Sequence, residues 1–212
     1  MPDHDKLNAP EATAARTERG LQTRERILDS AARLFYIKGV GSTTLDDVRA
    51  ASSTSKSQLY DHFPDKTALI HAVIDVQSQS VLAREAGHLK GVRNLSGLRR
   101  WRDALVQSNM LHDGSYGCAL GAMSSELSDN DERSRTALAA AFENWQRLLV
   151  EALTRLRDLG VLRSDIDPRK LGTGLLAALQ GGYILAQNRH NPELMADALD
   201  MALDRIDSFA NR

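Results

Sequence analysis

The stretch that decides the fold is Thr54–Phe63, with the sequence TSKSQLYDHF. Leu59 and Phe63 are four residues apart, so on a helix they share one face and can pack inward. The remaining positions carry side chains that can hydrogen-bond: Lys56, Ser57, Gln58, Tyr60 and His62. A helix this short is not stable by itself. The pattern therefore predicts a short helix that neighbouring helices hold, with a polar face directed at a partner.

Two further helices are expected before this stretch, each with its own capping signals. The first carries apolar residues at helical spacing after Thr23, a plausible N-cap, and ends where Gly39 provides a left-handed C-cap. Thr44 starts the second, TLDDVRAA, and Asp47 lies three residues later, where its carboxylate can satisfy free N–H groups.

The deciding stretch has a capping box of its own. Ser55 is expected as its N-cap, and Gln58 follows three residues later. Pro64 ends the helix, and Asp65 starts a longer one that leads into the rest of the chain. Two very short helices joined by a tight turn indicate a helix-turn-helix, in which the second helix enters the major groove of DNA.

Beyond residue 75 every periodic segment is helical. Helices are expected over LSGLRRWRDALVQSNML, over GAMSSEL, over Arg133–Leu159, and in the two stretches that Pro168 and Pro192 open. No strand pattern of useful length is present. The chain is predicted to be all-α: a disordered arm over 1–15, a helix-turn-helix DNA-binding domain over 16–66, and a helical ligand-binding and dimerisation domain over 67–212.

Composition excludes some classes of protein but does not identify the function. The chain has 212 residues, 42% hydrophobic and 26% charged, which is ordinary for a soluble globular protein. No apolar run is long enough to span a membrane, and a single cysteine favours a reducing, cytoplasmic setting. No nucleophile motif, phosphate loop, metal-ligand spacing or cofactor motif is present, so an enzyme is not expected.

The segment TTLDDVRAASSTSKSQLYDHFPDKTALI resembles the N-terminal domain of the TetR-type transcriptional repressors. The resemblance runs from Thr23 to about Val73 through the patterns A-x-L-F…KG, S-T-T-L-x-x-V and S-K-x-x-L-Y-x-H-F-x-x-K. YGCALGAMSSEL also resembles a segment of one subgroup of these repressors. The resemblance implies a homodimer that binds a palindromic double-stranded operator and releases it when a small-molecule effector occupies the C-terminal domain.

The same resemblance implies roles for single residues. Lys56, Ser57 and Gln58 match positions that read base edges, which suits the donor groups of Lys and the bidentate amide of Gln. Positions that touch phosphates are matched by Thr44, Tyr60, His62 and Lys66.

The match departs from the family pattern at two positions. Ser53 stands where the family usually has Gly at the turn, so a positive φ there would cost about 1 kcal/mol. Arg49 stands where a small residue is common, so either the helix rotates slightly or Arg49 reaches a phosphate. Residues 16–66 carry nine Lys and Arg against seven Asp and Glu, so affinity must come from a few placed contacts.

The C-terminal domain offers candidates for the effector site among its large or polarizable residues. They are Trp101, Met110, Tyr116, Cys118, Met123, Phe142, Trp145, Gln180 and Tyr183. Gln180 is the most informative, because a polar amide on an apolar helix needs a partner, either a ligand, a facing helix or its mate across a dimer axis. Cys118 could be a redox sensor, a pocket wall or a buried small side chain, and a free Cys is most commonly just buried.

Dimerisation is expected through the last two helices, which from two chains would form a four-helix bundle. Small residues thin the first helix, and apolar residues including Met201 line the second. The predicted interface residues are Gly174, Ala178, Gly181, Gly182, Leu199, Leu203 and Ile206. An alternative keeps the dimer but makes the chain a protein-interaction module that no longer binds DNA, which the near-neutral N-terminal domain, Asp61 and Ser53 favour.

Overall fold

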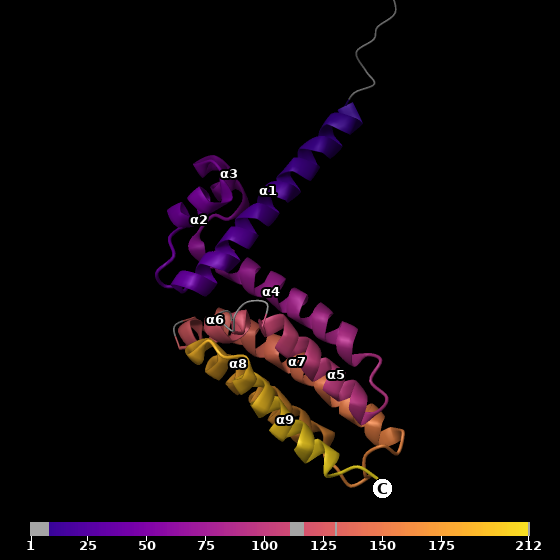
Figure 1. The fold of residues 1–212 in the computed structure, drawn as a ribbon. Coiled ribbons are helices and arrows are strands. Elements are labelled where there is room, and N and C mark those ends of the chain that lie inside the picture. Colours follow the sequence, from indigo (N-terminus) through magenta and orange to yellow (C-terminus); the bar gives the residue numbers. More distant parts are fainter. Residues whose placement is uncertain (1–8, 111–116, 130, 212) are drawn as a thin grey trace, which may run out of the picture. The chain divides into compact units, whose positions relative to one another are not determined.

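The computed structural model of the chain describes residues 9–110, 117–129 and 131–211, and the regular elements of that part are helices (Figure 1). It divides into two compact units, with the division between Val73 and Ile74. The division lies inside α4 (Lys66–Leu89) and not at residue 66, because Leu69 and Val73 on the first turns of α4 are buried with the N-terminal unit. The all-α prediction is confirmed.

The N-terminal unit contains α1 (Ala9–Lys38), α2 (Leu45–Ser52) and α3 (Lys56–His62), with α2 and α3 both packed on α1. The prediction that Thr23 begins the first helix is wrong. Thr23 is buried in the middle of α1, and its hydroxyl donates to the carbonyl of Arg19 at 2.8 Å. This hydrogen bond to the carbonyl four residues earlier gives the buried hydroxyl a partner within the helix. Residues 9–15, expected in a disordered arm, are helical.

The remaining capping predictions in this unit are confirmed. Gly39 has φ of 85°, and Thr44 and Ser55 each form a complete capping box, with Asp47 and Gln58 respectively. Asp65 begins α4, because its carboxylate accepts from the N–H of Ala68 at 2.7 Å. Local sequence alone explains these helix starts, since each uses a side chain three residues or fewer from the group it satisfies.

The C-terminal unit is built from the rest of α4 together with α5 (Leu95–Met110), α6 (Ala119–Leu127), α7 (Glu132–Asp158), α8 (Pro168–Arg189) and α9 (Glu193–Asp207). α7 packs against both α6 and α8, and α9 packs against α8 and α5 (Figure 1). The core of this unit is centred on the fully buried Trp101 and Trp145.

The C-terminus is tied back onto the connection between α7 and α8. The N–H of Arg163 donates to the carbonyl of Phe209, and the N–H of Asn211 donates to the carbonyl of Val161. Leu162 and Ala210 form an isolated antiparallel bridge there. Within the described ranges, no helix combines the length and apolar character that a membrane crossing requires.

Candidate nucleic-acid interface and ligand site

The exposed face of α3 carries most of the residues that were predicted to contact DNA. Leu59 is buried, as is Phe63 directly after the helix, so the apolar pair anchors α3 as its spacing predicted. Exposed side chains cover the other positions: Lys56, Ser57, Gln58 and Tyr60, with His62 partly exposed. The Nζ of Lys56 lies 5.9 Å from the ring centre of Tyr60, one turn later on the same face.

Gln58 has a structural role that limits how it can bind a base. Its Oε1 accepts from the backbone N–H of Ser55 at 2.9 Å, while the Ser55 hydroxyl accepts from the N–H of Gln58 at 3.2 Å. The capping box uses the amide oxygen of Gln58, and the amide nitrogen Nε2 takes no part in it. Gln58 can therefore donate a hydrogen bond to a base through Nε2. A bidentate contact would also need Oε1, which already accepts from the backbone N–H of Ser55.

Lys66, at the start of α4, contacts the turn that leads to Thr44 at the start of α2. Nζ of Lys66 donates to the carbonyl of Gly41 at 3.2 Å, which places the ammonium group beside the turn that leads to Thr44. Thr44 is the exposed N-cap of α2. The backbone N–H and the hydroxyl of Thr44 both donate to the Asp47 carboxylate, at 2.9 and 2.8 Å, so a phosphate at this helix N-terminus would share these donors with Asp47.

Two of the acidic residues that could repel a duplex are paired within the unit. Asp46 accepts from Nε of Arg49 at 3.2 Å, and Asp47 pairs with Lys38 at 3.1 Å. The Thr44 backbone N–H and hydroxyl, followed by the Lys38 ammonium group, lower the pKa of Asp47 to about 2. Arg49 thus has a local partner in Asp46.

The turn between α2 and α3 contains the expected strained residue. Ser53 has φ of 53° and ψ of 43°, a left-handed conformation that Gly adopts at no steric cost. The turn is held by the N–H of Ser53, which donates to the carbonyl of Ala50, and by that of Thr54, which donates to the carbonyl of Arg49. Ser52 and Thr54 share a buried hydroxyl–hydroxyl bond of 2.9 Å that fixes its inner side.

The predicted ligand residues divide by location. Trp101, Met123, Trp145 and Tyr183 are buried in the C-terminal unit, and Cys118, Phe142 and Gln180 are partly buried there. Met110, the last residue of α5, is exposed, so the structure does not support it as part of a buried pocket. Tyr116 lies outside the described residues.

Cys118 has a local role at the start of α6. Its Sγ accepts from the N–H of Gly121 at 3.4 Å, so the thiol acts as the N-cap. Burial raises the pKa of this thiol, which keeps it protonated at neutral pH. This environment favours the pocket-wall and buried readings of Cys118 over a redox sensor, which needs an accessible thiolate.

Glu85 and Arg84 on α4 were missed by the sequence analysis. Glu85 is 0% exposed, and its carboxyl group accepts from the indole N–H of Trp101 at 2.7 Å and from Nε and Nη2 of Arg84 at 3.1 and 3.0 Å. Helical spacing could have found Glu85, since it lies four residues from the buried Val81 and four from the buried Leu89. Trp101 therefore has a structural partner inside the unit.

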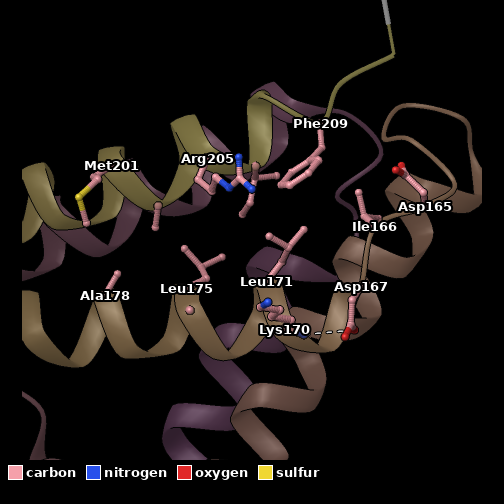
Figure 2. Close-up of a pocket in the computed structure, with 13 residues that line it drawn as sticks. Asp165, Ile166, Asp167, Lys170, Leu171, Leu175, Ala178, Met201, Arg205 and Phe209 are labelled. Carbon is pink, nitrogen blue, oxygen red and sulfur yellow. Dashed lines mark hydrogen bonds between the residues drawn. The ribbon is translucent and has the colours of Figure 1, made fainter.

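The outward face of α8 and α9 contains a hollow of about 570 Å³. Figure 2 shows Leu171 and Leu175 of α8 directed toward Arg205 and Phe209. Phe209 lies between two guanidinium groups, with Cζ of Arg205 at 4.3 Å and Cζ of Arg163 at 5.7 Å from its ring centre. Large apolar side chains are exposed on the same two helices: Ile184 (66%), Leu185 (49%) and Met201 (72%).

The predicted interface residues fall on both sides of α8 and α9. Gly174, Ala178 and Gly181 keep some exposure on the outward face. Gly182, Leu199 and Leu203 are buried within the subunit, so the prediction that they form the interface is not supported, and Ile206 is also buried but lines the hollow. These residues point inward because α8 and α9 pack on one another within the subunit. Only the other faces of the two helices remain available to a partner chain.

Two glycines of α8 serve that internal packing. A Cβ at Gly182 would lie 3.0 Å from Cα of Met195, so its absence lets α9 approach the backbone of α8. A Cβ at Gly172 would lie 2.8 Å from Cγ2 of Val150 on α7. A Cβ at Gly174 or Gly181 would meet nothing within 4 Å.

Two models of known protein families match most of the chain. Residues 27–73 match the family model for bacterial regulatory proteins of the tetR family, and residues 95–201 match the C-terminal domain of LmrA/YxaF-like transcriptional regulators. The transcriptional repressor DhaR of Mycobacterium sp. strain GP1 is 25% identical over 188 residues, covering 86% of this chain and 91% of DhaR. The transcriptional regulator LmrA of Bacillus subtilis is 25% identical over 171 residues, covering 80% and 88%.

Solved structures have the same fold. The regulatory protein TetR from Rhodobacter sphaeroides superposes with a TM-score of 0.79 at 19% identity, covering 85% of this chain and 96% of that one. SmeT, the repressor of a Stenotrophomonas maltophilia multidrug efflux pump, superposes with a TM-score of 0.64 at 26% identity, covering 86% and 89%. These similarities extend over both units.

Proposed function

The chain belongs to the TetR family of bacterial transcriptional regulators, and from this premise we propose that it is a homodimeric repressor that binds a palindromic operator and releases it when a small molecule binds. The observation that carries the proposal is α3, with Leu59 buried and the donor groups of Lys56, Ser57 and Gln58 exposed. A helix held on one side and polar on the other suits readout in the major groove.

The phosphate contacts are proposed for the residues around α3. Tyr60 and His62 follow the base-reading positions on α3, and Thr44 with Lys66 forms a second, separate contact region. Asp46 and Asp47 are paired with Arg49 and Lys38, so these pairs add no net charge, and the attraction to DNA must come from these few placed contacts.

Homodimerisation is proposed through the outward face of α8 and α9. This face combines the exposed Ile184, Leu185 and Met201 with the open positions Gly174 and Gly181. Met201 lines the hollow, and Ile184 and Leu185 add exposed apolar surface on α8, which is typical of a protein interface. A two-fold operator also requires two recognition helices, which one subunit cannot provide.

The effector response is proposed for the C-terminal unit. α4 belongs to both units, so a ligand that changes the position of α4 in the C-terminal core also acts on the DNA-binding unit. The ligand must prefer one arrangement of the dimer, because equal affinity for two arrangements shifts neither.

Fluorescence anisotropy tests the DNA-binding proposal. The protein is titrated at about 150 mM salt into labelled DNA from its own upstream intergenic region and into scrambled DNA of equal length. Specific binding is expected to exceed binding to scrambled DNA by about 10³-fold or more. Lys56→Met should weaken specific binding, whereas Lys90→Met, which removes the same charge from an exposed site of the C-terminal unit, should not. Equal, salt-sensitive binding to every DNA tested in a genome-wide fragment selection would instead support the protein-interaction module.

A matched pair of leucines tests the dimer. Leu185 on α8 and Leu159 at the end of α7 are both 49% exposed. Leu185→Glu is expected to produce monomers in sedimentation velocity, because it places a charge in an apolar interface. Leu159→Glu should leave the dimer intact. A dimer that resists Leu185→Glu and Met201→Glu together would rule out this face.

A further inference from the structure

Arg24 on α1 holds its guanidinium group against the end of α3. Its Cζ lies 5.4 Å from the ring centre of Phe63, the residue directly after that helix. Phe63 is 2% exposed whereas Arg24 is exposed, so the arginine covers the ring from the solvent side. The His62 ring is a second neighbour of Phe63, with ring centres 6.3 Å apart. Arg24 therefore lies beside the residues of α3, although it belongs to another helix.

The place of Arg24 on α1 explains this contact. Ile27 and Leu28, about one turn later, are buried, whereas Leu21, three residues earlier, is 58% exposed. Arg24 thus lies at the turn where α1 leaves the core, and α1 packs on α3 within this unit. Contact with an aromatic ring restricts a long side chain that has many rotamers at an open surface.

The charge of Arg24 is not used in an ion pair with the described acidic residues. Two other cations of the same unit are paired, Lys38 with Asp47 and Arg49 with Asp46. The contact of Arg24 is with an uncharged ring. A guanidinium group that stacks on a ring keeps N–H donors at its edges, where they can bind two oxygens of one phosphate.

The end of α3 is a place where such a cation can meet DNA. A helix in the major groove has phosphates along both sides, and α3 is the helix proposed to lie there. We propose that Arg24 binds a backbone phosphate beside α3 and so adds a contact from α1. Phosphate contacts carry no sequence information, so Arg24 should strengthen binding to every DNA by a similar factor. This inference rests on the proposed DNA binding by α3.

Two substitutions on α1 test the contact. Arg24→Met removes the charge and keeps an unbranched side chain that can cover Phe63. Arg33→Met is the matched control, because Arg33 is also exposed on α1 but lies nine residues later, about two and a half turns, on the opposite face. Both variants should melt within a few degrees of the wild type, since both arginines are exposed.

Anisotropy titrations measure the effect with DNA from the upstream intergenic region and with scrambled DNA, from about 50 to 200 mM salt. Arg24→Met is expected to weaken binding to both DNAs about tenfold at the lowest salt. The slope of log Kd against log salt concentration should fall by about two, because each subunit of the dimer loses one phosphate contact. Arg33→Met should change neither quantity. Arg24→Lys keeps the charge and should restore the slope.

Each contrary outcome has a separate meaning. Unchanged binding of Arg24→Met to both DNAs would overturn the contact and leave the proposed function intact. Weaker binding to the specific DNA alone, with an unchanged salt slope, would mean that Arg24 acts through Phe63 on the position of α3 and not on phosphate. A wild-type protein without preference for any DNA would contradict the proposed function, while the salt slopes would still report the contact. A wild-type protein that binds no DNA would contradict both.

Discussion

The amide oxygen of Gln58 accepts a hydrogen bond from the backbone N–H of Ser55 at 2.9 Å, which joins the first turn of the recognition helix to its own N-cap. The same side chain is one of three that are proposed to read base edges. If it does, the stability of α3 and the contact with DNA depend on different atoms of one residue, Oε1 for the cap and Nε2 for the base.

Gln58→Glu should separate these two roles. Glutamate at this position keeps the capping box, so the free energy of unfolding is expected within about 0.5 kcal/mol of wild type. Specific DNA affinity should fall at least tenfold, in line with the roughly 1–3 kcal/mol that one good base contact provides. Chemical denaturation and anisotropy measure the two quantities.

The control for this experiment is Gln58→Ala, which removes both atoms. It should lose about 1 kcal/mol of stability as well as DNA affinity. Full affinity in Gln58→Glu would show that Nε2 makes no contact with DNA.

Ser53→Gly should stabilise the protein. Ser53 has a left-handed φ of 53°, and replacing it by Gly removes steric strain of about 1 kcal/mol. His190 caps α8 with φ of 50°, so His190→Gly should act in the same direction. Urea denaturation at one protein concentration measures both.

Ser57→Gly provides the opposite control, because Ser57 lies inside α3 in a helical conformation. It should destabilise the protein by up to about 1 kcal/mol. A loss of stability in Ser53→Gly would mean that the greater freedom of Gly in the unfolded chain outweighs the strain that the substitution removes.

Asp47 should contribute to the acid sensitivity of the protein. Its pKa is lowered from an ordinary 3.8 to about 2 in the folded state, so the unfolded chain binds this proton more readily. The stability it contributes is fully present above pH 4 and is lost as the pH falls toward 2. Melting temperatures recorded from pH 5 to pH 2 should therefore fall less steeply for Asp47→Asn than for wild type.

Asp46→Asn is the matched control, because Asp46 is the neighbouring carboxylate on α2 and takes no part in the capping box. It should follow the wild-type curve. Identical slopes for wild type and Asp47→Asn would exclude the folded-state contacts of Asp47 as a cause of acid sensitivity.

Gly182→Ala should destabilise the subunit, whereas Ala is normally the better helix former. The added Cβ would lie 3.0 Å from the backbone of Met195, and overpacking of this kind costs about 1–3 kcal/mol. Gly87→Ala on α4, where nothing lies within 4 Å, should instead gain up to about 1 kcal/mol. Thermal unfolding measures both, and an equal gain at both sites would show that α8 and α9 can separate freely.

Local patterns predicted the elements well, because each depends on residues close together in the chain. The capping boxes of Thr44 and Ser55, the left-handed Gly39 and the inward pair Leu59 and Phe63 all follow from spacings of four residues or fewer. Thr23 misled the analysis for the same reason. A threonine before an apolar repeat has the local pattern of an N-cap, and only the long α1 shows that it lies inside a helix.

The sequence by itself thus determined the all-α fold, the helix-turn-helix and the residues exposed on α3. Tertiary structure alone decided which faces of α8 and α9 remain open, because Gly182, Leu199 and Leu203 are buried by helix packing that no local spacing specifies. It also decided that the indole N–H of Trp101 has a hydrogen-bond partner in Glu85, which lies on another helix. Hydrogen bonds between distant residues depend on how whole helices pack, so they can be assigned only once the chain has folded.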